Sequence, residues 1–274
     1  MGADLDHSAA EFRRARAPEF GRAAEDYRRH RAGFPESLFD RLRDLGIGLA
    51  GQALLDVGTG TGTLALGFAR RGCRVIALDP DRSMLAGARE LAREQGLTLE
   101  LREARAEATG LAPASVDVVT AGQCWHWFER AAAARELARV LRPDGRLAIA
   151  HFDWLPLPGN VVAATEALIE SHNPAWRLGG GLGVHPRWLR DLGEAGYRSI
   201  ESFSYDVEVP YTHEGWRGRI RASAGVGASL SPTEVEAFDR ELGRLLAERF
   251  PEEPLAVPHR VFAVTATAPP EVRA

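Results

Sequence analysis

The residues of this chain best suited to chemistry are three closely spaced glycines and the two aspartates that flank them. Gly58, Gly60 and Gly62 follow Asp56, and Asp79 stands at the end of the next apolar run. Glycines at this spacing let backbone N–H groups approach a ligand closely where a helix begins. An acidic residue in the place of Asp79 can accept hydrogen bonds from ribose hydroxyls. The pattern predicts a turn that binds a ligand containing a nucleoside.

Two details of this turn bear on which nucleoside it binds. Dinucleotide-binding folds use G-x-G-x-x-G, and here Thr63 occupies the third glycine position. Asp56 lies two residues before the first glycine, where its carboxylate would repel a pyrophosphate but suits a ligand with an ammonium group. The pattern favours an amino-acid nucleoside. A nicotinamide dehydrogenase and a purely structural glycine-rich turn are the alternatives.

Histidines form a second set of candidates. In the stretch "GQCWHWF", His126 lies between Trp125 and Trp127, directly after an expected strand. The carboxyl ends of such strands form the ligand-binding edge of an open α/β sheet. His126 could act there as a general base in an aromatic pocket, or it could be bonded to backbone while both tryptophans pack. His151 is a second candidate base, and Asp153 would either orient a histidine or cap the next helix.

Apolar strands alternate with helical stretches from residue 50 to 150, which is typical of a mostly parallel α/β sheet. The expected strands cover 53–58, 73–79, 97–104, 115–121 and 146–152, and the expected helices cover 64–72, 83–96 and 130–145. Two further strands are expected at 198–209 and 260–267, with glycine- and proline-rich loops and helices before them. Ser231-Pro232-Thr233-Glu234 predicts a helix start, because it has the form of a capping box with proline at the first position.

Composition excludes several classes of function. The 274 residues have a formal net charge of −4, so no electrostatic footprint for nucleic acid is expected. No apolar run approaches the roughly 18 residues of a membrane span, and the polar start lacks the apolar segment of a signal peptide. A cytoplasmic protein is therefore expected. Two cysteines without a CxxC predict neither a disulfide framework nor a metal site. The chain contains no lysine, which excludes Schiff-base chemistry and a Walker-type phosphate loop.

With these motifs in view, the chain resembles the class I S-adenosylmethionine-dependent methyltransferases. "LLDVGTGTG" resembles their first motif, and "VIALDPDRSML" resembles their second. "VDVVTAGQCWHWF" and "ELARVLRPDGRLAIA" are similar to the segments around their fourth and fifth strands. Within the class, the chain is similar to the small-molecule branch that contains trans-aconitate methyltransferase-like proteins. Those proteins share a Tyr-then-Arg segment before the first strand and an H-W-F after the fourth.

The resemblance implies a Rossmann-like α/β fold, with a seven-stranded, mostly parallel sheet whose last strand is antiparallel. It implies an N-terminal helical lid over 1–46, a cofactor-binding core over 47–155 and a substrate-side insertion with sheet completion over 156–274, within a single catalytic domain. The implied cofactor is S-adenosyl-L-methionine, and the implied partner is a small-molecule methyl acceptor rather than a nucleic acid or a membrane. The oligomeric state is not predicted.

The resemblance also implies roles for particular residues. The glycines would line the methionine part of the cofactor near Asp56, Asp79 would bind the ribose hydroxyls, and Met84 would pack near the adenine. The full cofactor set is Tyr27, Arg31, Asp56, Gly58, Gly60, Gly62, Asp79, Pro80, Met84, Ala106, Glu107 and Gln123. Trp125, Trp127 and Asp153 would face the acceptor, and Tyr27 would cover the sulfonium while Arg31 pairs with a carboxylate. One departure concerns Arg105, which stands where many relatives carry aspartate; Glu107 or a backbone carbonyl is then expected to contact the adenine.

The expected reaction is O-methylation of a hydroxyl or a carboxylate. Transfer from a sulfonium is a direct displacement, so alignment and exclusion of water supply most of the catalysis. A carboxylate needs no base, whereas a hydroxyl gains about 10²–10⁴-fold from a positioned histidine such as His126 or His151. The alternatives are N- or C-methylation of a natural-product scaffold, and a non-methylating use of the cofactor such as cyclisation. Heavy arginine and alanine usage without lysine suggests a GC-rich bacterial genome, where such tailoring enzymes are common.

Overall fold

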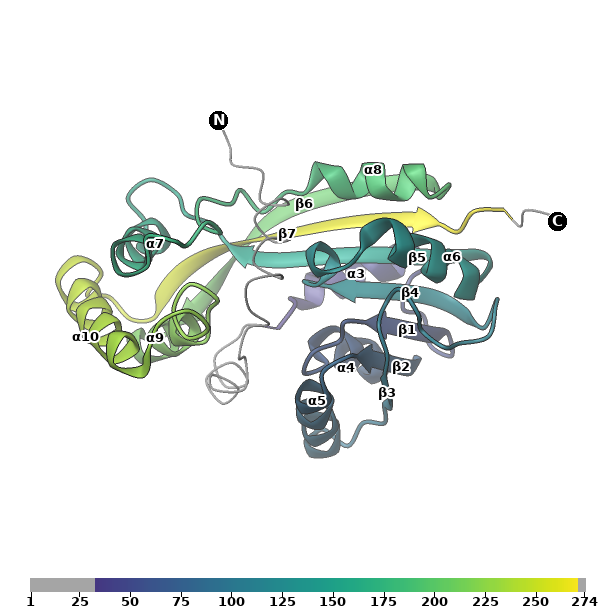
Figure 1. The fold of residues 1–274 in the computed structure, drawn as a ribbon, viewed down its shortest axis with the longest axis horizontal. Coiled ribbons are helices and arrows are strands. Elements are labelled where there is room, and N and C mark those ends of the chain that lie inside the picture. The colour runs from purple at the N-terminus through teal and green to yellow at the C-terminus, as the bar shows by residue number, and fades with distance from the viewer. Residues whose placement is uncertain (1–32, 271–274) are drawn as a thin grey trace. The chain divides into compact units, whose positions relative to one another are not determined.

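The computed structural model describes residues 33–270 of the chain. Tyr27, Arg31 and most of the expected lid lie outside the described residues. Within the described range, seven strands form one sheet in the order β3-β2-β1-β4-β5-β7-β6 (Figure 1). The strands are β1 (Ala53–Val57), β2 (Arg74–Asp79), β3 (Glu100–Glu103), β4 (Val116–Gly122), β5 (Leu141–Trp154), β6 (Arg198–Tyr211) and β7 (Leu255–Thr267).

The sheet is mostly parallel. Strand β1 pairs in parallel with both β2 and β4, β3 extends the parallel set beyond β2, and β5 extends it beyond β4. The last strand, β7, runs antiparallel. The expected Rossmann-like fold is thereby confirmed. Strand order reverses between β1 and β4, and ligands of open α/β sheets bind outside the carboxyl ends of the strands at such a point.

The chain divides into two compact units. One contains residues 33–152, 185–204 and 261–270, and the other contains 153–184 and 205–260. The segment 156–274, expected to be a substrate-side insertion with sheet completion, therefore contributes to both units. We refer to the first as the glycine-turn unit and to the second as the helical unit.

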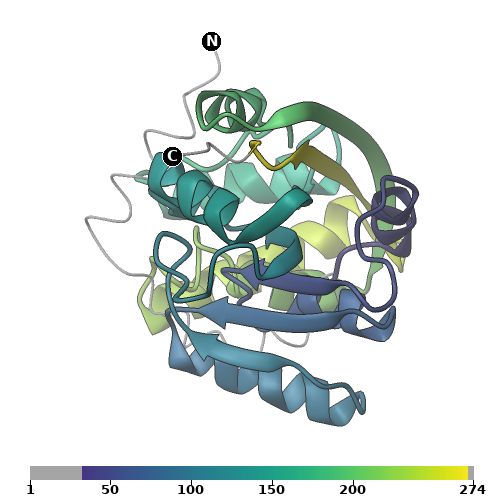
Figure 2. The same cartoon turned by 90° about the vertical axis from the view of Figure 1, so that its right-hand side faces the viewer.

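In the glycine-turn unit, helices cover the sheet in two groups. Helices α4 (Thr63–Arg70) and α5 (Arg82–Glu94) pack on the parallel strands, and Figures 1 and 2 show α5 alongside β2 and β3. Helix α3 (Glu36–Asp44) sets Phe39 against Phe68 of α4, with ring centroids 5.1 Å apart. Helices α6 (Arg130–Val140) and α8 (Pro186–Glu194) pack on each other and enclose the main core with Leu137, Trp188 and the inner side chains of β1, β4 and β5.

The helical unit has its own core. Helices α7 (Val161–His172), α9 (His213–Arg221) and α10 (Pro232–Arg249) bury a cluster that includes Trp216, Phe238 and Leu242. The helix start at Ser231 is confirmed: both halves of its capping box with Glu234 form, and Pro232 occupies the first helical position. Among the helices that the structure describes, none is long and apolar enough to cross a membrane.

The predicted boundary between a helix over 130–145 and a strand from 146 is wrong. Helix α6 ends at Val140, and β5 begins at Leu141, which pairs with Val116 of β4. Arg142 then donates a hydrogen bond to the Asp117 carboxylate. The Pro-Asp-Gly turn signal therefore marks an irregularity inside the strand: the β4–β5 register shifts there and Asp144 adopts a φ of 60°. Local turn chemistry predicted a stop, and pairing with the neighbouring strand overrode it.

Candidate active site

The glycine turn connects the end of β1 to the start of α4. Gly58, Gly60 and Gly62 all have positive φ, of 60°, 56° and 83°, a conformation that L side chains rarely adopt. A Cβ on Gly58 would lie 2.9 Å from Cβ and Sγ of Cys124, so glycine is needed there for close packing. A Cβ on Gly60 would meet no atom within 4 Å. The turn is therefore closely packed at Gly58 and has open space at Gly60.

Asp56 lies beneath this turn and is 1% exposed. Its two carboxylate oxygens accept hydrogen bonds from the hydroxyls of Thr59 and Thr120, each at 2.6 Å. The carboxylate thus joins β1, the turn and β4. Its position near the glycines agrees with the predicted neighbourhood, and these two hydrogen bonds show that it holds the turn in shape.

The pKa of Asp56 is raised to about 6, chiefly because burial disfavours its charged form, although the two threonine hydroxyls act in the opposite direction. The folded protein therefore holds this proton more tightly than the unfolded chain, and stability falls as pH rises from about 4 to about 6. A pKa shift of about two units corresponds to a fall in stability of about 3 kcal/mol. We expect Asp56→Asn to abolish this fall, because asparagine has no proton to lose in this pH range. Urea unfolding of both proteins between pH 4 and pH 7 measures it.

Glu136→Gln is the control for that experiment. The hydrogen bond from Arg139 holds the pKa of Glu136 at about 2, below its ordinary 4.5. The stability that this carboxylate contributes is present above pH 4.5 and is lost only as pH falls toward 2, so between pH 5 and pH 7 the profile of Glu136→Gln should run parallel to that of the wild type. Parallel pH profiles for wild type and Asp56→Asn would contradict the assignment to Asp56.

Asp79 ends β2 and faces the turn across one hydrogen bond. Its Oδ2 accepts from the backbone N–H of Gly60 and its Oδ1 accepts from that of Asp81, both at 2.9 Å. Burial raises the pKa of this carboxyl, while those two backbone donors act to lower it. An ionised carboxylate has about four acceptor positions, so about two remain for ligand hydroxyls. Asp79 is thus held in place with acceptor capacity to spare.

The other predicted cofactor residues on this side follow Asp79 directly. Pro80 is exposed between β2 and α5. Asp81 caps α5 by accepting from the N–H of Ser83 at 2.7 Å, and Met84 lies half-buried in the first turn of the helix. The structure therefore brings Pro80 and Met84 to the carboxyl edge of the sheet beside Asp79.

Three more predicted contacts come from the following loops. Ala106 is buried in the main core, and Glu107 accepts a hydrogen bond from the N–H of Glu129 at 2.8 Å. Gln123 has a φ of 57° and donates its side-chain amide to the carbonyl of Phe152 at 2.6 Å, which ties the end of β4 to β5. Glu107 and Gln123 thus each serve the local structure, and their contact with a cofactor stays a prediction.

The two histidines predicted as candidate bases, His126 and His151, lie close together. His126 belongs to the short helix η2 (Trp125–Trp127), and its ring centroid is 6.0 Å from that of His151 on β5 and 4.8 Å from that of Trp127. Both come from the carboxyl ends of neighbouring parallel strands, β4 and β5. The edge of the sheet thus carries two imidazoles and a half-buried indole within one small area.

His185, which the sequence analysis did not select, extends this group. Its ring lies 4.5 Å from that of His151 and stacks on Trp188 at 4.1 Å with an interplanar angle of 6°. Phe262 of β7 packs at its edge, 5.7 Å away. In the sequence, His185 is only a histidine before the Pro-Arg-Trp start of α8, and nothing there indicates which residues its ring contacts. Among residues 33–270, no group of His, Cys, Asp and Glu side chains is arranged to hold a metal ion.

Trp125 and Asp153 are the remaining residues predicted on the acceptor side. Trp125 is fully buried in the main core and donates its indole N–H to Asp191 at 3.1 Å. Since its whole ring is enclosed, it packs the core; Trp127 is half-buried, and its contact with an acceptor stays a prediction. Asp153 accepts a hydrogen bond from the N–H of Trp154. Burial lowers the pKa of His259, and the charge of Asp153 acts in the opposite direction. His259, on β7 in the helical unit, was also missed by the sequence analysis.

Comparison with known proteins identifies the region that contains the turn. Residues 55–149 match the family model described as a methyltransferase domain. This part of the chain is similar to methyltransferase domains. The match begins in β1 and ends in β5, so the domain contains the glycine turn, Asp79 and His126. His151, Asp153 and His185 come after it along the chain.

Relatives with similar sequences match about half of this chain. An uncharacterized methyltransferase of Mycobacterium tuberculosis is 38% identical over 137 residues, which cover 50% of this chain and 53% of the relative. A ubiquinone biosynthesis O-methyltransferase of Aeromonas salmonicida is 36% identical over 119 residues, covering 43% of this chain and 50% of that one. The chain therefore spans about half the length of these relatives.

A solved structure extends the likeness to the whole fold. A protein of Anaeromyxobacter dehalogenans that carries the name of a type II methyltransferase superposes with a TM-score of 0.62 at 25% identity. The superposition covers 88% of this chain and 99% of that chain. The fold of this chain is therefore similar to that of a solved methyltransferase-like structure.

Proposed function

We propose that this protein is an S-adenosyl-L-methionine-dependent methyltransferase that acts on a small molecule, with oxygen as the methylated atom. The methyltransferase domain supports the reaction class. The name of one relative, a ubiquinone biosynthesis O-methyltransferase, supports oxygen as the acceptor atom. Membership of the trans-aconitate methyltransferase-like branch stays a prediction.

The open face of the glycine turn is the observation that carries this proposal. Gly60 presents its backbone to free space, and Asp79 is fixed beside it with acceptor positions remaining. A ligand with an amino-acid part and a ribose fits this pair, because backbone N–H groups and the start of α4 favour a carboxylate while Asp79 accepts from ribose hydroxyls. Pro80, Met84, Ala106, Glu107 and Gln123 complete the proposed cofactor set, together with Tyr27 and Arg31 before the described range.

On the acceptor side, His126 and His151 are the proposed bases, and Trp127 and Asp153 the proposed acceptor contacts. Bound S-adenosyl-L-methionine supplies an electrophilic methyl group. The protein has then to align the acceptor oxygen with it, exclude water and receive the hydroxyl proton on an imidazole nitrogen. A carboxylate acceptor would need only the first two of these.

Calorimetry with S-adenosyl-L-methionine and S-adenosylhomocysteine tests the cofactor assignment. We expect saturable binding of both and none of NADH, because Thr63 replaces the third glycine of a dinucleotide site. Binding of neither sulfur nucleoside would refute the proposal. Cofactor binding without methyl transfer to any acceptor in a panel of phenols and carboxylic acids would instead favour a non-methylating reaction.

The two proposed bases make a separate prediction. With a hydroxyl acceptor, alanine at the residue that serves as base should lower kcat about 10²-fold or more, because a general base contributes about 10²–10⁴-fold. With a carboxylate acceptor, the same variant should keep nearly full activity. His172→Ala is the matched control, since that histidine pairs with Glu241 on the helical unit. If neither His126→Ala nor His151→Ala slows transfer to a hydroxyl, neither residue is the base.

A further inference from the structure

Helices α9 and α10 of the helical unit border a hollow of about 710 Å³. Among residues 33–270, those that line it are Arg217, Arg240, Gly243, Arg244 and Ala247. Arginines predominate among these, and the glycine and the alanine are too small to fill the space between them. Small-molecule sites commonly measure about 300–1,000 Å³, so the hollow has room for an organic ligand. The methyltransferase assignment uses none of these residues.

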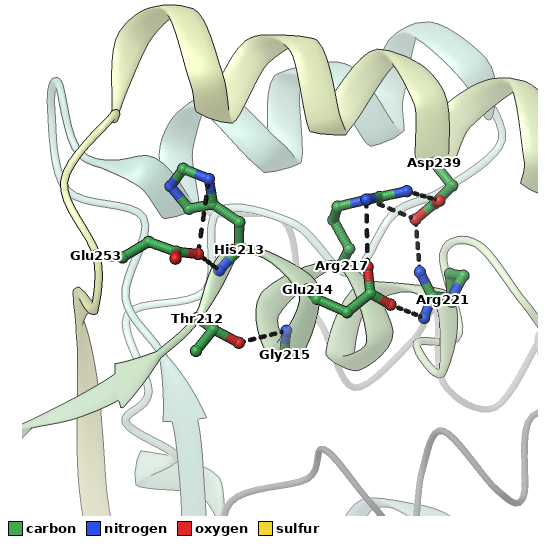
Figure 3. Close-up of polar contacts among 8 residues, drawn as sticks. All are labelled: Thr212, His213, Glu214, Gly215, Arg217, Arg221, Asp239 and Glu253. Atoms are coloured by element: carbon green, nitrogen blue, oxygen red, sulfur yellow. Dashed lines mark hydrogen bonds and ion pairs between the residues drawn. The ribbon is translucent and has the colours of Figure 1, made fainter.

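Arg217, which lines the hollow, is fixed by ion pairs drawn in Figure 3. Arg217 donates from both Nε and Nη2 to the Asp239 carboxylate, and from Nη1 toward Glu214 at 3.2 Å. Arg221 binds the same two carboxylates at 2.7 and 2.8 Å. Two arginines and two acids make this network neutral as a whole. It holds the Arg217 guanidinium over Gly243, where a Cβ would lie 3.5 Å from its Cζ.

The other two lining arginines, Arg240 and Arg244, are exposed on α10. Arg240 and Arg244 stand one helical turn apart on α10, and neither makes an ion pair or hydrogen bond to another residue within 33–270. The nearby carboxylate of Glu241 is engaged with His172 at 3.0 Å. Like charges four residues apart on a helix repel each other. A bound dianion between the two guanidinium groups would turn this repulsion into attraction.

We propose that this hollow is an anion site for a phosphate-bearing small molecule, with Arg240 and Arg244 as its charged ligands and Arg217 as its fixed wall. Guanidinium groups bind phosphate oxygens through two parallel N–H donors, and two arginines that have no ion-pair partner within 33–270 match one dianionic phosphate. The volume exceeds what a single phosphate requires, so the ligand is a phosphate ester or a diphosphate rather than the inorganic ion alone. Small side chains at Gly243 and Ala247 leave the floor open to its organic part.

Titration calorimetry with inorganic pyrophosphate tests the site in the full chain, at fixed ionic strength and with and without S-adenosylhomocysteine. We expect saturable binding that the nucleoside leaves unchanged and that Arg240→Gln/Arg244→Gln weakens at least tenfold. Arg249→Gln removes the same charge from the same helix outside the hollow and should leave the affinity within about twofold, because a charge that does not contact the anion acts on it only through attraction screened by salt. Absence of binding, or equal loss in both variants, would overturn the proposal.

Two further measurements test the same site: the effect of a substitution beside Arg217, and the binding of citrate. Glu214→Gln removes a negative charge next to Arg217 while Asp239 still holds that arginine, so pyrophosphate affinity should rise. A change in that direction cannot come from unfolding, and a fall in affinity would count against the site. Citrate at equal charge separates phosphate recognition from general attraction: binding as tight as that of pyrophosphate would overturn the phosphate assignment.

Discussion

Asp79→Ala is expected to weaken the binding of S-adenosyl-L-methionine by about 100-fold or more. The proposed ribose contacts are two hydrogen bonds to a charged acceptor, each worth about 1.5–3 kcal/mol. Every 1.4 kcal/mol corresponds to about tenfold in the dissociation constant, so losing both bonds exceeds two orders of magnitude. The variant also frees the N–H groups of Gly60 and Asp81, whose hydrogen bonds Asp79 accepts in the wild type. Calorimetry gives the affinity, and urea unfolding of the ligand-free protein gives the structural cost.

Asp81→Ala is the matched control for that experiment. Asp81 is two residues away and caps α5 through the N–H of Ser83. Loss of an N-cap costs about 0.5–2 kcal/mol of stability, so this variant should unfold earlier while its affinity for the cofactor changes little. If Asp79→Ala binds S-adenosyl-L-methionine as tightly as the wild type does, the ribose role of Asp79 is wrong.

Gly58→Ala is expected to destabilise the folded protein by about 2–5 kcal/mol. A left-handed φ costs an L residue about 1–2 kcal/mol, and overpacking a tight site adds about 1–3 kcal/mol. The second cost applies here because the new Cβ would lie 2.9 Å from Cβ and Sγ of Cys124 and 3.0 Å from Phe128. Denaturant unfolding at neutral pH measures the loss.

Gly60→Ala separates stability from binding in the same turn. Its φ of 56° carries a similar backbone cost, and no atom lies within 4 Å of the added Cβ. We therefore expect a loss of only about 1–2 kcal/mol of stability. The methyl group would project into the space proposed for the cofactor, so the affinity for S-adenosyl-L-methionine should fall at least tenfold. Equal destabilisation by both variants would contradict the close packing at Gly58, and unchanged affinity in Gly60→Ala would move the cofactor elsewhere.

The glycine turn shows how much of the candidate site the sequence could predict. Its residues are contiguous, and the need for positive φ can be deduced from glycine spacing alone, without knowledge of distant contacts. The bonds of Asp56 were not predictable in the same way, because Thr120 lies 64 positions along the chain and arrives only through the β1–β4 pairing. The sequence thus predicted a ligand turn, and the pairing of the strands showed which carboxylate supports it.

The same distinction applies to the histidines. His126 follows one strand and His151 lies near the end of another. When both strands are parallel, their carboxyl ends meet at one edge of the sheet, and the 6.0 Å separation of the two rings agrees with that expectation. His185 reaches them from the start of α8, and nothing in the intervening chain encodes that approach locally. The sequence left the packing of Trp125 open for a related reason: a motif does not show which of two nearby indoles turns into the core.

The amino-acid sequence by itself determined the parallel α/β core, the glycine turn and the capped start of α10, because each depends on neighbours within a few residues or on a regular apolar period. Only the tertiary structure decided where α6 gives way to β5, which aspartate is buried beneath the turn, and which arginines of α9 and α10 face one hollow. These features depend on side chains that are distant along the chain and meet through packing. Their contact free energies outweigh the local preferences that a sequence displays.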